Sequence, residues 1–454
     1  MPHDRADVQI QREGDGITVR LLDGLYLLLI ATLPIVRPFG VSVAGLVVPV
    51  SDLIFVVAAL AWIADLVSRR RAVRPSRVYP LLALYFAALC CSAWFSESPG
   101  RSALKLVGET YLIGLAVLTI NVVRSWTMLR RVLQAWMVAT AVTVLSGVLA
   151  VLLFYAGQER LSTVFGLTFL GSLPPGNYPR VQSLFLNVNM LCNYLIVSLM
   201  LALVMRALGW LTRSRSRWLL AGTWITGLFT ASAGIGGLLL GAGSWRWLRG
   251  SSSRPGIPDR LVFGGSLAAA AAFLAATTVV PFPGVRDTGF AVPAANVTLQ
   301  AGPRVPVWQT AYRTFAEHPL VGQGLGTDVA VVEWVAPAGY TLQLRDAHNV
   351  WLSLAGQGGL LATTAFALLV AWLCRSVWPL RRGPDRSALV GTGLGLALIG
   401  ALLYHGLSGA FEDARHLWVL MGLIACVAEG LDGAGAEEPT PTPAPATGFR
   451  PPGR

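Results

Sequence analysis

The sequence predicts an all-α, polytopic membrane protein with about 12 transmembrane helices. Hydrophobic residues make up 54% of the 454 residues and charged residues only 13%, whereas roughly a quarter of an ordinary soluble chain is charged. Apolar stretches of about 20 residues, the length that crosses a bilayer, recur along the chain. Arginines gather in every second connection between these stretches, as the positive-inside rule requires.

Ten apolar stretches each have the length of one membrane span. A longer one, residues 218–247, exceeds one span and is short for two. Its centre, Thr-Ala-Ser-Ala-Gly at 230–234, favours a turn between two short helices, which completes the predicted set of spans. The ten single spans are 21–36, 42–67, 78–95, 104–123, 132–156, 184–205, 261–282, 351–374, 388–408 and 415–431.

Arginine placement orients these spans. With both termini in the cytoplasm, the cytoplasmic segments hold most of the 35 basic residues, including those at 69–77 and 375–386. One helix more or fewer would disrupt the alternation. The net charge of +12 is thereby explained by topology, and it gives no reason to expect a nucleic-acid partner.

The spans divide the chain into five consecutive parts. The first has no signal-peptide pattern, and the last is Pro-rich and expected to be disordered. The large loop is expected to contain short helices. The parts are a cytoplasmic segment 1–20, spans one to nine in 21–282 with an outer loop at 157–183, a large outer loop 283–350, the last three spans in 351–431, and a cytoplasmic tail 432–454.

Metal and disulfide chemistry find little support in the sequence. The five cysteines lie in or beside predicted spans without a C-x-x-C pair, so neither a disulfide framework nor a zinc site is indicated. No tight carboxylate cluster offers oxygen ligands for a divalent cation. We therefore expect no metal and no other cofactor.

The large outer loop contains an amphipathic pattern, "PRVPVWQTAYRTFAEHPL". Apolar residues at 307 or 308, 311 or 312, and 315 recur at helical spacing, which predicts a helix that ends before Pro319. Arg304 falls in its first turn, beside backbone N–H groups that favour an anion. The following "GQGLGT" lacks the context of a nucleotide-binding loop, so we interpret it as a tight connection.

His348 is predicted to lie at the outer mouth of the tenth span. A solvent-accessible histidine held by a rigid helix is suited to act as a general base. Alternatively, His348 and Asn349 cap the helix start, with Asp346 near its positive end. Residue type alone leaves both interpretations open.

Three stretches of the chain together resemble the O-antigen ligase and polymerase superfamily of bacterial envelope glycosyltransferases. They are "PRVQSLFLNVNMLCNYL" (179–195), "GPRVPVWQTAYRTFAEHPLVGQGLGT" (302–327) and "HNVWLSLAGQGGL" (348–360). The resemblance rests mainly on the series G-x-R-x-x-x-W, H-P-L-x-G-x-G-x-G and H-N-x-x-L within one outer loop. It spans most of the chain. The series is more specific for the superfamily than for any one member.

This resemblance implies a GT-C-like, metal-independent, inverting transferase in the bacterial inner membrane. It implies an undecaprenyl diphosphate-linked glycan as donor, lipid A–core or another glycan as acceptor, membrane lipids as surroundings, and an active site on the periplasmic side. His348 is implied as the catalytic base, with Arg304 and Arg180 on the donor diphosphate. Further site candidates are Asp346, Asn349, Asn189, Trp308, Arg313, Arg345 and Asp413.

One departure from the family concerns the outer turn between the seventh and eighth spans. Many relatives carry Ser-Arg-Gly there, and this chain has Ser232, Ala233 and Gly234. The expected arginine is therefore missing, and Arg180, Arg313 or Arg345 would have to replace it.

Three other functions remain alternatives. A polymerase or a protein O-oligosaccharyltransferase would share the donor and differ in the acceptor. A lipid-linked glycan transporter would make no bond and would place charged groups at the bilayer midplane. The candidate groups of this chain gather at the predicted outer surface, which favours an enzyme.

Overall fold

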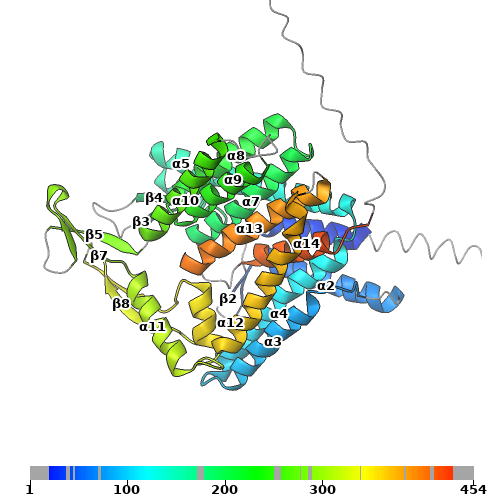
Figure 1. Ribbon diagram of the computed structural model, residues 1–454, viewed down its shortest axis with the longest axis horizontal. Coiled ribbons are helices and arrows are strands. Elements are labelled where there is room, and N and C mark those ends of the chain that lie inside the picture. Colours follow the sequence, from blue (N-terminus) through cyan, green and yellow to red (C-terminus); the bar gives the residue numbers. More distant parts are fainter. Residues whose placement is uncertain are drawn as a thin grey trace, which may run out of the picture.

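A computed structural model shows a bundle of helices from which a smaller, partly stranded region projects on one side (Figure 1). Its two chain ends lie outside the described part. The structure describes residues 20–36, 41–43, 46–69, 73–170, 178–249, 257–276, 278–284, 289–337, 339–382, 385–408 and 414–432.

Helices make up most of the described chain, beginning with an unlabelled helix at residues 20–32. Most of them overlap the predicted apolar stretches, but Glu159–Val164 and Arg304–Glu317 lie in predicted outer loops. The predicted span 42–67 is wrong at its start, because the chain there forms two short strands and becomes helical only at Val50. The other helices are α2 (Val50–Arg69), α3 (Tyr79–Trp94), α4 (Pro99–Val122), α5 (Trp126–Tyr155), α6 (Glu159–Val164), α7 (Val188–Ala207), α8 (Arg213–Phe229), α9 (Gly234–Arg249), α10 (Ile257–Ala276), α11 (Arg304–Glu317), α12 (Val350–Val377), α13 (Arg386–Ser408) and α14 (Arg415–Ala428).

Seven of the described helices are long and apolar enough to cross a membrane: α2, α4, α5, α7, α10, α12 and α13. The apolar helices α3 and α14 are shorter. A helix of about 20 apolar residues matches the hydrocarbon thickness of a bilayer. The helices therefore indicate a membrane-embedded protein.

Helix α7 forms the centre of the bundle. It packs against α5, α8, α9 and α13, and nearly all of its residues are buried. A helix that is apolar all round has no polar face to turn toward water. By contrast, α10 packs mainly against α9 and leaves most of its apolar surface outside the bundle, as a lipid-facing helix does.

The long apolar stretch at 218–247 divides as expected. Helix α8 ends at Phe229 and α9 begins at Gly234. Between them Ala231 has a φ of 44°, a left-handed conformation that turns the chain sharply. The turn brings residues 230–233 to the same end of the bundle as the start of α7.

The expectation of an all-α fold is wrong for the loops, where short antiparallel strands occur. They pair as β1 with β2 and β3 with β4, as a three-stranded sheet in the order β5-β7-β6, and as β8 with β9. Their bounds are β1 (Val41–Val43), β2 (Leu46–Val48), β3 (Leu167–Leu170), β4 (Tyr178–Val181), β5 (Val279–Pro283), β6 (Phe290–Val292), β7 (Val297–Ala301), β8 (Val332–Val335) and β9 (Thr341–Leu344).

The predicted span 261–282 is also wrong at its end, because α10 stops at Ala276 and β5 follows. Pro281 and Pro283 cannot donate the backbone hydrogen bonds of a helix. An edge strand tolerates proline, and β5 lies at the edge of its sheet. The described part of the large loop thus contains the helix α11, a short 3₁₀ helix at Pro293–Ala295 and strands, so the expected short helices are joined by β-structure.

The glycine-rich connection fits into a break in α12. Gly359 lies inside α12 with φ 60° and ψ −160°, and the chain at 319–324 supplies the missing backbone partners. The Gln323 N–H donates to the Gly356 carbonyl at 2.8 Å, and the Leu360 N–H donates to the Pro319 carbonyl at 2.8 Å. Gly322, Gly324 and Gly326 all have positive φ, so the segment is the tight connection that its composition predicts.

Candidate functional site

His348 immediately precedes α12 in a strained backbone conformation. Its φ is 46°, in the left-handed region that few non-glycine residues occupy. Strain of this kind persists where surrounding contacts enforce it, and it is common at functional sites. The His348 side chain is 42% exposed, and its Nδ1 lies 3.5 Å from Oδ2 of Asp346.

The other oxygen of Asp346 is held by the helix that follows. Ser353, in the first turn of α12, donates its hydroxyl to Asp346 Oδ1 at 2.9 Å. The carboxylate is therefore anchored on one side and faces the imidazole on the other. A carboxylate beside Nδ1 favours the tautomer with its proton on Nδ1, which leaves Nε2 free to accept a proton.

Asn349, and not His348, caps α12. The Asn349 side-chain oxygen accepts hydrogen bonds from the N–H groups of Trp351 at 3.0 Å and Leu352 at 3.2 Å. This bears out the capping interpretation for Asn349. It also releases His348 from that role, because the first free N–H groups of the helix already have their acceptor.

Helix α11 is tied to this segment by Trp308. The Trp308 indole donates to the carbonyl of Ala347 at 3.0 Å. Around it, a small cluster of buried Val307, Ala311, Val329 and Ala347 packs the inner face of α11 against the chain before α12. The amphipathic helix predicted from the sequence is thus present, and it positions the residues beside His348.

Arg304 is the first residue of α11. Its Nη1 is buried and has no hydrogen-bond partner among the described residues. Burial lowers the pKa of Arg304, and the nearby Tyr404 acts in the opposite direction. A guanidinium remains protonated despite such shifts, so a buried donor without an acceptor points toward an anionic ligand.

Arg180 approaches the same place from β4. Its Nε donates to the Thr230 carbonyl at 2.7 Å and its Nη2 to the Ala231 carbonyl at 3.2 Å. Burial lowers the pKa of Arg180, while Tyr404 raises it and the positive charge of Arg304 lowers it. Like charges that act on each other in this way favour an anion bound near both of them.

A polar network links this turn to two spans. Ser232 donates its hydroxyl to Asn189 Oδ1 of α7 at 2.9 Å and lies 3.3 Å from the hydroxyl of Tyr404 on α13. Asn189 thus contacts the turn between α8 and α9, and Ser232 connects it to α13. Ala233 is buried, and the guanidinium of Arg180 reaches this turn through Thr230 and Ala231.

Tyr404 was not predicted from the sequence. It is buried on α13 and is the group that influences the pKa values of both Arg180 and Arg304. A lone tyrosine within an apolar span gives only a weak signal, since most tyrosines of that kind pack in the core. Only the meeting of α13 with the 230–233 turn distinguishes it.

The remaining candidates are less closely connected to this site. Arg345 lies 3.9 Å from Asp328 and donates to Gln343, and Arg313 is exposed on α11. Asp413 lies outside the described residues. Arg415, two residues later, pairs with Asp52 through two hydrogen bonds of 2.8 and 3.0 Å.

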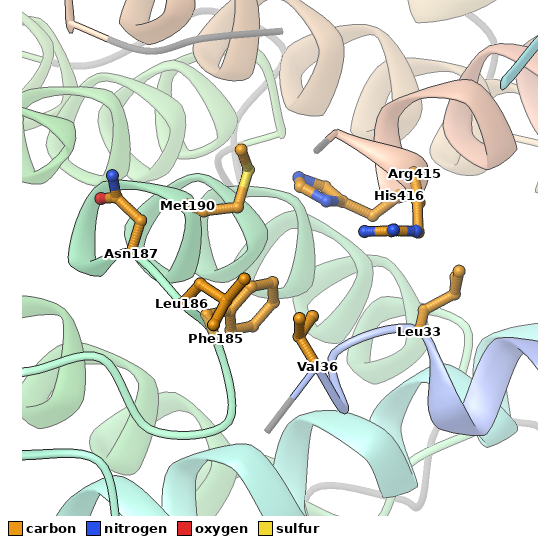
Figure 2. Close-up of a pocket in the computed structure, with 8 residues that line it drawn as sticks. All are labelled: Leu33, Val36, Phe185, Leu186, Asn187, Met190, Arg415 and His416. Carbon is orange, nitrogen blue, oxygen red and sulfur yellow. The ribbon is translucent and has the colours of Figure 1, made fainter. Parts of the chain in front are cut away.

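A separate small cavity of about 20 Å³ lies between the first helix, α7 and α14. Figure 2 shows Met190 of α7 opposite His416 of α14, with Arg415, Phe185 and Leu33 nearby. The buried His416 Nε2 lies 2.7 Å from Asn193 Oδ1. The cavity has room for about one water molecule, so we interpret this region as structural.

Among the described residues, no three His, Cys, Asp or Glu side chains are placed to hold a metal ion. No family model matches the chain, and no curated protein is significantly similar to it. The arrangement itself therefore has to indicate the chemistry. It combines two half-buried guanidiniums, suited to a phosphate or diphosphate, with an accessible imidazole backed by a carboxylate.

Proposed function

We propose that this protein is an O-antigen ligase-like glycosyltransferase. It would move a glycan from undecaprenyl diphosphate to an acceptor hydroxyl, that of lipid A–core, on the periplasmic face of the bacterial inner membrane. The observation that carries the proposal is Arg304 Nη1, which is buried without a hydrogen-bond partner among the described residues, together with Arg180, on whose pKa the charge of Arg304 acts. The series of motifs in the large loop is the basis for proposing this family.

In this proposal the two arginines bind the donor diphosphate. Negative charge grows on the diphosphate as the bond between the sugar C1 and the phosphate oxygen breaks. Guanidiniums fixed in advance by the fold stabilise that charge more in the transition state than in the ground state. The positive end of the α11 dipole adds to the positive field, and no divalent metal is required.

His348 acts as the general base. Its Nε2 accepts the proton of the acceptor hydroxyl while the hydroxyl oxygen attacks C1 from the face opposite the leaving group. The electron pair of the broken C1–O bond leaves with the lipid diphosphate. Because the attack comes from the opposite face, the configuration at C1 inverts. Asp346 stabilises the imidazolium that forms, and the proton is later released to solvent or to the diphosphate.

Arg180 also offers a replacement for the arginine that the family pattern expects at the 232–234 turn. The proposal assigns it the role of the arginine that relatives carry at the turn, because its guanidinium already binds the carbonyls of Thr230 and Ala231. Part of its donor capacity is used in this way. The remaining N–H groups of Nη1 and Nη2 are the ones assigned to the donor.

We further propose twelve membrane spans with both termini in the cytoplasm. Support comes from the arginine alternation and from the grouping of segments at two ends. The starts of α7, α9, α11 and α12 lie with the candidate site, whereas the segment before α3 and the ends of α12 and α14 border one cleft. These two groups are the segments assigned to opposite sides of the membrane.

The proposal is tested with purified full-length protein and an undecaprenyl diphosphate-linked oligosaccharide, with and without lipid A–core. Glycan on lipid A–core is the expected product. Chain lengthening without that acceptor would establish a polymerase instead, and glycan on an added peptide would establish a protein O-oligosaccharyltransferase. Movement of the donor across proteoliposomes without a new bond would replace the enzyme by a transporter.

A further inference from the structure

A cleft of about 950 Å³ opens at the far end of α12 from His348. The two places lie at opposite ends of α12, which has 28 residues. Three parts of the chain form the cleft walls: residues 74–77 before α3, the last turns of α12, and residues 428–432 after α14. The catalytic proposal uses none of these residues.

Three arginines line the cleft. Arg74 is fixed in the wall, because it donates to the Val123 carbonyl at 3.1 Å and to the Gly430 carbonyl at 2.6 Å. Arg77 and Arg375 are exposed, and neither guanidinium pairs with another described residue. Arg77 comes from the segment before α3 and Arg375 from α12, so the two unpaired cations stand on different walls.

One acidic residue of the lining, Glu429, is hydrogen-bonded within the wall itself. Glu429 Oε1 accepts hydrogen bonds from the Ser76 hydroxyl at 2.9 Å and from the Arg77 N–H at 2.6 Å. Its Oε2 is buried from solvent. Glu429 therefore joins the segment after α14 to the segment before α3, and it leaves the side chains of Arg77 and Arg375 to face an outside anion. Asp432 is the other acid of the lining.

The position of the cleft suits a lipid headgroup. Arg375 lies at the last turns of α12, a helix apolar and long enough to cross a membrane, and Trp372 in the same wall is half-buried. Tryptophan and arginine at the end of a span mark the interface between hydrocarbon and headgroups. Basic pockets between spans at this level bind the phosphates of anionic lipids.

We propose that this cleft binds the phosphate diester of an anionic phospholipid headgroup from the membrane leaflet on that side. Arg77 and Arg375 would hold the phosphate oxygens from two walls, and Trp372 would contact the glycerol region. A free phosphate compound shares the anion but lacks the acyl chains. The proposal is independent of glycan transfer.

The test is native mass spectrometry of the full-length protein in detergent, titrated separately with phosphatidylglycerol and with phosphatidylcholine of the same chains. We expect one phosphatidylglycerol to bind at least about tenfold more tightly than phosphatidylcholine. Arg77→Gln with Arg375→Gln should remove that preference, whereas Arg77→Lys with Arg375→Lys should keep part of it. Arg217→Gln, an exposed arginine at the start of α8 outside the cleft, is the matched control.

Two results would overturn the proposal. One is a lipid preference that survives the double Gln substitution. The other is displacement of the bound lipid by millimolar glycerophosphoglycerol, which would assign the cleft to a soluble phosphate compound. Should the double variant fold poorly by circular dichroism and size exclusion, the single Arg77→Gln and Arg375→Gln variants decide, because each exposed side chain has no described partner to lose.

Discussion

The indole of Trp308 donates a hydrogen bond to the carbonyl of Ala347, across 39 residues of sequence and 3.0 Å in space. This bond joins α11, which begins with Arg304, to the residue directly before His348. It therefore connects the proposed anion-binding end of the site to the proposed base.

Trp308→Phe should separate these two parts without unfolding the protein. The ring still fills the cluster with Val307 and Ala311, while a hydrogen bond with a net contribution of about 1 kcal/mol is lost. We expect the rate of glycan transfer to fall about fivefold to tenfold if this energy is lost from the transition state, since about 1.4 kcal/mol corresponds to a tenfold change in rate. Transfer rate and melting temperature are measured together, and an unchanged rate would separate Trp308 from catalysis.

His348→Asn removes the imidazole and keeps the backbone. Asparagine tolerates the positive φ of this position better than most residues, so the fold should be retained. Loss of a general base typically costs roughly 10² to 10⁴-fold in rate. We expect a loss of this size in transfer to lipid A–core with donor binding retained, and wild-type turnover would exclude His348 as the base.

Arg304→Ala should lower transfer by roughly 10²-fold or more, as removal of a preorganised oxyanion donor does. Arg304→Lys keeps the charge without the planar fork and should give an intermediate rate. Arg160→Gln, an exposed arginine on α6, serves as the control. Equal rates for Arg304→Ala and Arg160→Gln would show that Arg304 does not contact the diphosphate.

Asn349→Ala should destabilise the start of α12. Two N–H groups lose their acceptor, and loss of an N-cap typically costs about 1 kcal/mol. Asn349→Asp, which keeps the accepting oxygen, should retain most of the stability. Thermal unfolding in detergent measures the difference, and identical melting temperatures for all three proteins would contradict the cap.

Gly359→Ala should prevent the glycine-rich connection from closing on α12. An added Cβ would lie 2.3 Å from the Leu320 carbonyl oxygen, and φ 60° is unfavourable for alanine. We expect a large loss of folded protein by size exclusion. Gly264→Ala, in a helical position of α10 with open space around it, should instead stabilise by up to about 1 kcal/mol.

The sequence by itself determined the helices, because apolar length and arginine placement follow from the bilayer, which acts on each segment separately. The turn at 230–234 and the helix that begins at Arg304 were predictable for the same local reasons. None of the strands β1 to β9 was predictable, because pairing depends on which segments meet, and their short runs carry little periodicity.

Only the tertiary structure decided how the site is composed. Arg180, Ser232, Arg304 and Tyr404 come from four distant parts of the chain, and their meeting depends on the packing of α7, α9 and α13. The tertiary structure also distinguished the roles of two neighbouring residues, because Asn349 caps α12 and His348 does not. The residue type gives the hydrogen bonds that a side chain is able to make. Its burial and its neighbours determine which donors remain without a partner, as at Arg304 Nη1.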